Sequence, residues 1–306
     1  MTQAQRLKNL TPPQGVVDVV MDTDAYTEID DLYAIAYLLK HTDKFNVKGF
    51  CAAPFNKPMR AATPKIAMEK SYDEVKFLLK MLHREEVPVF YGSEGYLPDE
   101  NTPVESPAAD FMATLANDYS PEHPLYILAI GSIPNVASAI LKNPKMKENC
   151  VIVWLGGNAP HVPQGANAYN MRQDIAGARI VFGCGIPLVH IPCEGVVDRL
   201  LTTKQELAYW IKDKNELCDY LYSRTVTEAE TFAGGRPWSR VIWDITTVAW
   251  LMNEKNRYMR DQIVPSYMPN YDLDYVFDES RHPICTVSFV NRDRIFEDLF
   301  GVLTQN

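Results

Sequence analysis

Short apolar runs alternate with segments of helical periodicity through most of this chain. Between these runs, apolar residues recur about every 3.6 positions, as on one face of a helix. Such alternation, with short connections, is typical of a mainly parallel sheet covered by helices on both faces. We therefore predict a doubly wound α/β fold. The expected strands are residues 16–21, 45–53, 87–90, 125–130, 151–155 and 188–191, and the expected helices between them are residues 66–83, 108–119, 135–141 and 174–182.

The C-terminal third has a different pattern. Extra helices are expected there at residues 204–211, 216–232 and 245–252, followed by a small β element at residues 261–267, 273–277 and 284–290. A final helix is expected at residues 292–303. Because the sequence contains no low-complexity linker and no internal repeat, we predict one domain over residues 1–306.

Charge and hydropathy exclude several classes of partner. The chain has 30 basic and 39 acidic residues, a net charge of −9, and no Lys/Arg run that would bind a polyanion, so we expect no nucleic acid partner. No apolar run is long enough to span a bilayer, and the polar start lacks the apolar region of a signal peptide. We expect a cytoplasmic protein without a membrane partner. The six cysteines form no C-x-x-C pair and are expected to be reduced and structural.

Five carboxylates are concentrated between the first predicted strand and a helix-like segment. In that segment apolar residues recur at helical spacing: Leu32, Ile35, Ala36, Leu38 and Leu39. In an open α/β sheet, such a strand-to-helix loop lies at the carboxyl edge, where ligands bind. Unpaired carboxylates so close together repel one another unless a proton or cation compensates them. Helix capping would explain the last two acids, but not the two at the strand end. The residues are Asp22, Asp24, Glu28, Asp30 and Asp31.

The ligand types in this loop favour a hard cation. No His or Cys lies nearby, so Ca²⁺ or Mg²⁺ fits better than zinc, and the spacing lacks the Gly and Glu of an EF-hand. Ca²⁺ can hold the vicinal diol of a sugar and lower the pKa of a water molecule, while a neighbouring Asp takes the proton. The chemistry therefore points to hydrolysis of a sugar derivative.

The chain also resembles the inosine-uridine preferring nucleoside hydrolase family, whose signature is a strand followed by Asp-x-Asp-x-x-x-Asp-Asp. Further similar segments follow in the family's order, from a second strand ending at Asn56 to Trp243-Asp244 at the start of a helix. Between them lie residues 129–135, similar to the family's Gly-Pro-Leu-Thr-Asn turn, and residues 154–158 and 169–170, similar to its ribose-binding stretch, which residues 174–178 continue as in the family. The resemblance covers over three quarters of the chain.

The resemblance implies roles for individual residues. It implies that Ca²⁺ is bound by Asp24, Asp31, Asp244 and the carbonyl oxygen of Pro134, with Asp22 supporting the cluster. It further implies that Asp24 is the general base for the attacking water. The residues implied to bind the ribose hydroxyls are Asp30, Asn56 and Asn170, with Asn158 as a looser candidate. A homodimer or homotetramer is also implied.

Three departures from the family pattern concern the site. Two extra residues between Asp24 and Asp30 enlarge the loop and would bring Tyr26 or Glu28 into the pocket. The family's ribose-binding Glu is replaced by Ala168, and our hypothesis is that Glu28 or Asn167 supplies the missing hydrogen-bond acceptor.

The third departure is Trp243, which stands where many relatives have a His that protonates the leaving base. It resembles the purine-preferring branch, in which stacking on the base assists departure, although core packing would also explain a Trp in this apolar run. Tyr96 and Trp238 are other candidate stacking residues. Possible acids are His123, His161 and His282.

The predicted activity is Ca²⁺-dependent hydrolysis of the N-glycosidic bond of a ribonucleoside to ribose and free base, with Asp24 and Trp243 as catalytic residues. One alternative is a calcium-dependent ribose- or nucleoside-binding protein without turnover, which Ala168 and Trp243 would permit. Another is a haloacid-dehalogenase-type phosphatase, which also places Asp-x-Asp after its first strand. That class needs a downstream Lys and a further acidic pair, for which the sequence offers no convincing positions.

Overall fold

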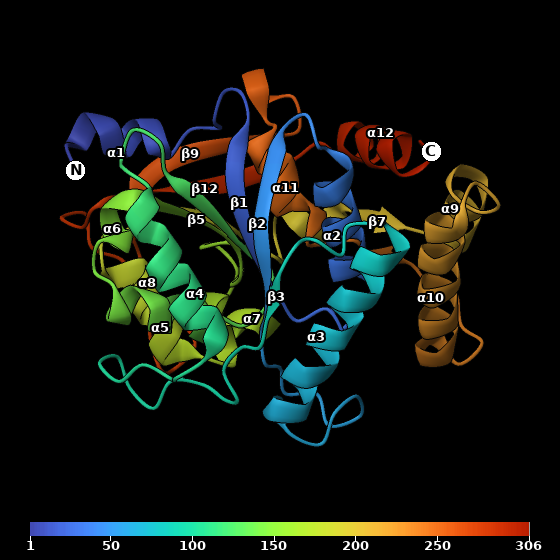
Figure 1. The fold of residues 1–306 in the computed structure, drawn as a ribbon, viewed down its shortest axis with the longest axis horizontal. Coiled ribbons are helices and arrows are strands. Elements are labelled where there is room, and N and C mark those ends of the chain that lie inside the picture. Colours follow the sequence, from blue (N-terminus) through green and yellow to red (C-terminus); the bar gives the residue numbers. More distant parts are fainter. Residues whose placement is uncertain (306) are drawn as a thin grey trace.

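The computed structural model describes residues 1–305 and contains a central twisted sheet (Figure 1). Within these residues the sheet has eight strands in the order β3-β2-β1-β4-β5-β6-β12-β9, all parallel except β9, which runs antiparallel to β12. The mainly parallel sheet predicted from the alternating pattern is confirmed. The strands are β1 (Val17–Thr23), β2 (Phe45–Ala52), β3 (Val89–Phe90), β4 (Leu125–Ala129), β5 (Cys150–Leu155), β6 (Leu188–Ile191), β9 (Met259–Pro265) and β12 (Pro283–Val290).

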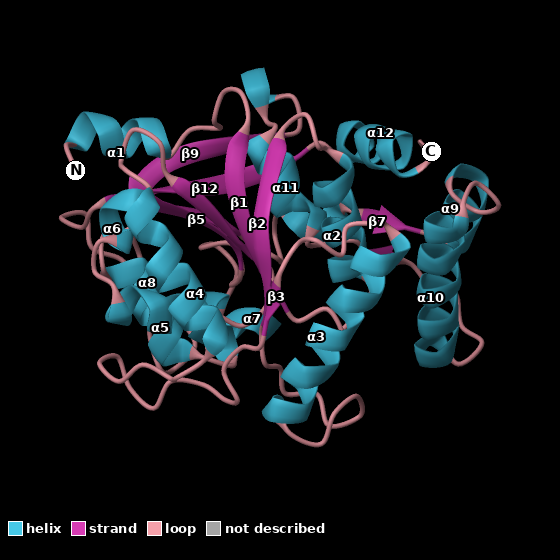
Figure 2. Cartoon of the chain, viewed as in Figure 1, coloured by secondary structure: helices cyan, strands magenta, loops and turns pink. Residues whose placement is uncertain are grey.

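Helices cover both faces of the sheet (Figure 2), because successive residues of the inner strands are apolar on both sides. In β1, Val19 and Met21 belong to one hydrophobic core, whereas Val20 between them belongs to the other. The first core includes residues of α2 (Asp30–Lys40), α3 (Pro64–Met81), α10 (Glu216–Ala233), α11 (Ile245–Leu251) and α12 (Arg292–Leu303). The second includes residues of α4 (Pro107–Leu115), α5 (Pro134–Lys142) and α8 (Ile175–Gly183).

The order of the strands creates a crevice between β1 and β4. From β1 the chain continues to β2 and β3 on one side, whereas β4, β5 and β6 follow on the other side. The connections after β1 and β4 therefore diverge to opposite faces, and ligands bind at the carboxyl ends of strands at such a point. The loop between β1 and α2, which carries the five carboxylates, starts at this crevice.

Strand prediction was less accurate in the C-terminal third. Residues 273–277 were expected to form a strand, but only β11 (Tyr275–Val276) does, paired with β10 (Met268–Pro269) in a separate two-stranded sheet. The Asn270 side chain accepts hydrogen bonds from the backbone N–H groups of Asp272 and Asp274, and Leu273 has a φ of 66°. This side-chain turn replaces the first half of the expected strand.

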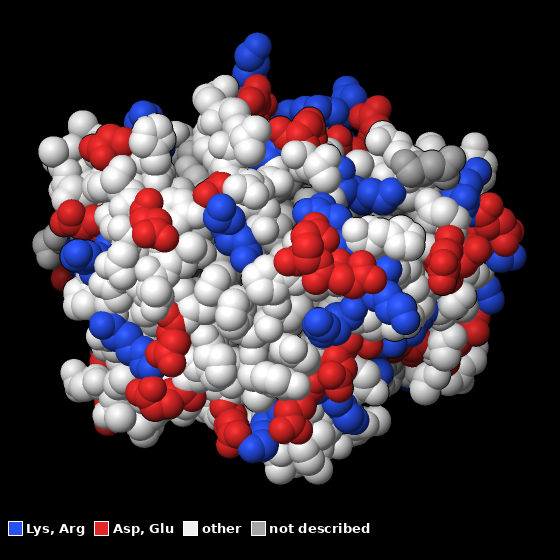
Figure 3. All heavy atoms as spheres, in the orientation of Figure 1, with Lys and Arg blue, Asp and Glu red and all other residues white. Residues whose placement is uncertain are grey.

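Short elements were not predicted. They include α1 (Gln3–Asn9), α6 (Met146–Asn149), α7 (Tyr169–Arg172) and the antiparallel pair β7 (Leu201–Thr202) and β8 (Arg240–Val241). The helix α9 (Lys204–Trp210) lies where one was expected. In residues 1–305 no helix combines the length and apolar character needed to cross a membrane. On the face shown in Figure 3, acidic and basic side chains are interspersed.

Candidate functional site

The carboxyl end of β1 is anchored by a buried asparagine. The Asn135 side chain, in the first turn of α5, donates to Asp22 Oδ1 at 2.8 Å and to the carbonyl oxygen of Ala52 at 3.0 Å. Its own oxygen accepts from the backbone N–H and the hydroxyl of Ser93, at 2.7 and 2.8 Å. One amide therefore connects the ends of β1 and β2 to the loop after β3. Asp22 is fully buried, and its second oxygen has no hydrogen-bond partner in the described residues.

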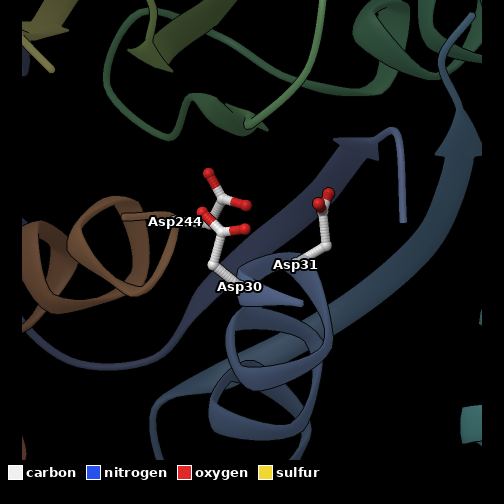
Figure 4. A group of neighbouring side chains, drawn as sticks. All are labelled: Asp30, Asp31 and Asp244. Carbon is white, nitrogen blue, oxygen red and sulfur yellow. The ribbon is translucent and has the colours of Figure 1, made fainter. Parts of the chain in front are cut away.

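Three aspartates at the starts of two helices lie close together beside this strand end (Figure 4). Asp30 and Asp31 form the start of α2, and Asp244 directly precedes α11. Each offers a carboxylate oxygen, and the three oxygens lie within 4.8 Å of one another. All three residues are buried, with at most 5% of their surface exposed. Asp24 lies outside this group of three, but it lines the same cavity. Side-chain capping does not account for the acids of α2, because Ile29 occupies its N-cap.

Burial and mutual repulsion raise the pKa values of these carboxyl groups. Burial raises the pKa of Asp24 to about 7, and burial with the repulsion of Glu28 raises that of Asp30 to about 7. Burial and the neighbouring carboxylates also hold the pKa values of Asp31 and Asp244 well above the ordinary range. Without a cation, the protein cannot keep all four groups charged at neutral pH.

The donor set fits a hard divalent cation. Two oxygens on opposite sides of a Ca²⁺ ion lie about 4.6–5.2 Å apart, twice a bond of 2.3–2.6 Å, and the three carboxylate oxygens meet that limit. The group consists of carboxylates alone, without the nitrogen or sulfur ligands that zinc prefers. This aspartate group could therefore hold a metal ion.

The aspartates line a cavity of about 470 Å³ at the carboxyl edge of the sheet. Three further residues that were predicted to bind substrate or take part in catalysis also line the cavity: Asn158, Asn170 and Trp243. Both amide hydrogens of Asn170 are directed at strand ends: Nδ2 donates to the carbonyl oxygens of Ile130 and Leu155, at 2.8 and 3.0 Å. Its oxygen accepts no hydrogen bond from residues 1–305 and is available to a ligand. Trp243 is half-buried, because it both packs against the core and lines the cavity.

Asp24 and Asn158 are also held in place by neighbours. The Thr27 hydroxyl donates to Asp24 Oδ2 at 2.7 Å, and Asp24 Oδ1 lies against Gly131, where an added Cβ would be only 3.0 Å away. The side-chain oxygen of Asn158 accepts from the backbone N–H of Glu194 at 3.1 Å, and its amide hydrogens have no acceptor among the residues that the structure describes.

Two predicted residues are not among those that line the cavity. Asn56 is exposed, and its backbone N–H and carbonyl oxygen bind Gln173 and the Tyr169 hydroxyl, at 2.6 and 3.2 Å. Pro134 is buried as the first residue of α5. The roles predicted for both remain predictions. The other candidates that do not line the cavity are Tyr26, Tyr96, Trp238, His123, His161 and His282.

Glu28, from the enlarged loop, does line the cavity and is held between two cations. Its Oε1 accepts from Lys57 at 2.8 Å, and its Oε2 accepts from Arg240 at 2.7 Å. Although burial raises the pKa of Glu28, the attraction of Arg240 and Lys57 outweighs it and lowers the pKa below its ordinary value. Arg240 also pairs with Glu228 at 3.2 Å, and Glu228 with Arg60. Asn167 and Ala168 line the cavity as well.

The sequence did not identify several other residues of the cavity wall. Tyr169 and Arg172 flank Asn170, the one residue of α7 to which the family resemblance assigns a role. Arg240 lies more than 200 positions from Glu28, and nothing in either segment indicates their contact. Cys193 follows β6, and burial raises the pKa of its thiol to about 12, so it remains protonated at neutral pH. Glu194 lines the cavity as well.

Comparisons with known proteins identify the family and the fold. The family model described as inosine-uridine preferring nucleoside hydrolase matches residues 19–287. Among solved structures, a plant nucleoside hydrolase is similar with a TM-score of 0.76 at 19% identity, over 95% of this chain and 99% of that one. A purine-preferring ribonucleoside hydrolase from Gardnerella vaginalis has a TM-score of 0.76 at 18% identity, over 94% and 98% of the two chains.

The type III effector XopQ, solved in complex with adenosine diphosphate ribose, has a TM-score of 0.71 at 15% identity, over 99% of each chain. At these identities the structural likeness establishes the fold alone. No curated protein sequence matched the chain.

Proposed function

Because the chain belongs to the inosine-uridine preferring nucleoside hydrolase family, we propose that it hydrolyses the N-glycosidic bond of ribonucleosides to ribose and free base. The observation that carries this proposal is the aspartate group at the β1–β4 crevice, formed by Asp30, Asp31 and Asp244. A deep carboxylate group beside amides suits a ligand with several hydroxyl groups and a reaction that develops positive charge.

We further propose that the metal is Ca²⁺, held by Asp24, Asp31, Asp244 and the carbonyl oxygen of Pro134. The all-oxygen donor set supports this choice, since Ca²⁺ tolerates an irregular oxygen shell. When bound, Ca²⁺ would hold the 2′- and 3′-hydroxyls of the ribose together with the attacking water and lower the pKa of that water.

The chain's own residues would bind ribose and accept a proton. Asp24 would take the proton of the attacking water, since Thr27 already fixes one of its oxygens and leaves the other for this task. The free oxygen of Asn170 and a carboxylate oxygen of Asp30 would accept hydrogen bonds from ribose hydroxyls. Asn158 would donate from its amide group, and Asn56 would contribute after a movement of its loop.

Bond cleavage makes the ribose ring resemble an oxocarbenium ion, with positive charge near C1′. The buried carboxylates would stabilise this charge because they are already oriented and shielded from water. Trp243 would stack on the base, a contact worth about 1–3 kcal/mol, which favours the larger purine ring. We therefore propose a preference for purine ribonucleosides.

A second candidate is a ribose- or nucleoside-binding protein that has lost turnover. The observation that favours it is Ala168, which lines the cavity without the hydrogen-bond acceptor that the family resemblance places there. The haloacid-dehalogenase-type phosphatase considered from the sequence gains no support, since the family match is to nucleoside hydrolases.

Incubation of the calcium-loaded protein with a panel of purine and pyrimidine ribonucleosides tests the proposal. We expect release of free base and reducing sugar, faster from purine nucleosides, and loss of turnover when EDTA is added. A 2′-deoxyribonucleoside should react far more slowly because it lacks half of the diol. Tight binding of nucleosides without release of base would favour the binding protein instead.

Assembly and location remain predictions from the sequence. A homodimer or homotetramer is expected, and light scattering coupled to size-exclusion chromatography would measure the mass relative to the 34.7 kDa chain. A cytoplasmic location would be tested by cell fractionation.

A further inference from the structure

The charges that line the cavity are arranged by depth. The acids Asp30, Asp31 and Asp244 are buried, whereas Arg172 is exposed at the rim. The proposed reaction also separates positive from negative charge. Heterolysis of the N-glycosidic bond leaves positive charge on the ribose and moves the bonding electron pair onto the base.

Among the basic residues that line the cavity, Arg172 is the one available to bind a negatively charged base. The other lining arginine, Arg240, is paired with Glu28 and Glu228. The Arg172 guanidinium forms no ion pair or hydrogen bond with any residue in the range 1–305. It lies 5.5 Å from the centre of the Tyr169 ring, and this cation–π contact holds it on the cavity wall while its N–H donors remain available.

The cavity has few other ways to assist the leaving base. No histidine of the described residues lines it, and the indole N–H of Trp243 can donate a hydrogen bond but is too weak an acid to protonate the base. The Tyr169 hydroxyl already donates to the carbonyl oxygen of Asn56 at 3.2 Å. Glu28, which is held between two cations, would repel an anionic base rather than protonate it.

We propose that Arg172 is a catalytic residue that donates hydrogen bonds to the departing base and stabilises it as an anion; this rests on the proposed N-ribohydrolase function. In the step, the water oxygen bonds to C1′, the C1′–N bond breaks with its electron pair going to the base nitrogen, and Asp24 accepts the water proton. Arginine keeps its own protons, so the base takes a proton from solvent and Asp24 returns its proton to solvent.

The fixed, planar arrangement of the guanidinium N–H donors also implies a preference among bases. Arginine binds two adjacent acceptors on one edge of a base, such as O6 and N7 of guanine. Adenine presents an amino donor in place of O6, which opposes an arginine donor. Arg172 should therefore favour the 6-oxopurine nucleosides inosine and guanosine over adenosine.

The test compares two substrates with different leaving groups in wild type, Arg172→Met and Arg172→Lys. The base that leaves inosine must be stabilised by the protein as it departs, whereas a nitrophenyl riboside releases an anion that is already stable. For Arg172→Met we expect kcat on inosine to fall about 100-fold, as when one donor is removed from an oxyanion site. The kcat on the nitrophenyl riboside should remain within about threefold, and inosine should lose its advantage over adenosine. Arg172→Lys should recover part of the inosine rate.

Arg260→Met is the matched control, since Arg260 also lies over an aromatic ring, that of Phe289, but outside the cavity. It should leave both rates unchanged. Equal losses on both substrates in Arg172→Met, or no loss on inosine, would overturn the role of Arg172. Wild-type protein inactive on both substrates would overturn the N-ribohydrolase function, and this inference with it.

Discussion

Replacement of Asn135 by alanine tests the anchor that holds the strand ends at the crevice. The Asn135 side chain makes four buried hydrogen bonds of 3.0 Å or shorter, to Asp22, to the carbonyl oxygen of Ala52, and to the backbone and hydroxyl of Ser93. A fifth, from the Ser106 hydroxyl, is long at 3.5 Å and is left out of the sum. At about 1 kcal/mol each, the loss of the four shorter bonds should lower the free energy of unfolding by about 4 kcal/mol. Because the second oxygen of Asp22 already has no partner, the variant leaves the whole carboxyl group without one.

Urea denaturation followed by tryptophan fluorescence, at fixed pH and with EDTA present, would measure this loss. Asn117→Ala is the matched control, since Asn117 is exposed, its amide donates to the carbonyl oxygens of Ala113 and Thr114 in the preceding helix, and its side-chain oxygen accepts one long hydrogen bond of 3.4 Å from Asn143. The control should change the free energy of unfolding by less than about 0.5 kcal/mol. A loss below about 1 kcal/mol in Asn135→Ala would refute the reasoning, because it would mean that water replaces the amide at no cost.

Three further predictions concern the cavity and the core. Glu28→Ala should lower kcat/KM for nucleosides if Glu28 supplies the acceptor absent at Ala168, and an unchanged kcat/KM would count against Glu28. Addition of Ca²⁺ at 100 times its dissociation constant should stabilise the folded protein by about 2.7 kcal/mol in thermal unfolding. Asp31→Asn should remove most of this effect, whereas an equal stabilisation of the variant would contradict the assigned ligand set. Burial lowers the pKa of His190 from 6.5 to about 4, so the unfolded chain binds its proton first as the pH falls. Stability present above pH 6.5 should therefore decline by about 3 kcal/mol as the pH falls towards 4. This decline should be absent from urea titrations of His190→Gln, and an identical pH profile in both proteins would contradict it.

Most of the fold could be predicted from the sequence because its signals are local. The strand β6 and the helix α12 lie where they were predicted. A buried strand is apolar throughout and an amphipathic helix is apolar on one face, so each can be predicted from the pattern of its own residues. The strand expected at residues 273–277 was shortened because a single side chain, Asn270, forms a turn with the backbone. Very short elements such as α7 and β8 are too brief to show a period.

The candidate site could be predicted only in part. The cluster from Asp22 to Asp31 was evident from the density of carboxylates, and the ordered resemblance added Asp244, which the structure brings next to Asp30 and Asp31. The contacts of Glu28 with Lys57 and Arg240 could not be foreseen, because they join a loop to residues far away in the sequence. The position of Asn56 outside the cavity was equally hidden.

The sequence by itself determined the doubly wound class, the family and the acidic loop, because each of these can be inferred from short stretches of neighbouring residues. Only the tertiary structure decided which charges share the cavity and at what depth. It buried the carboxylates under two helix starts and left Arg172 at the rim beside Tyr169. The physical reason is that Coulomb energies depend on distance and burial, and neither can be obtained from separation along the chain.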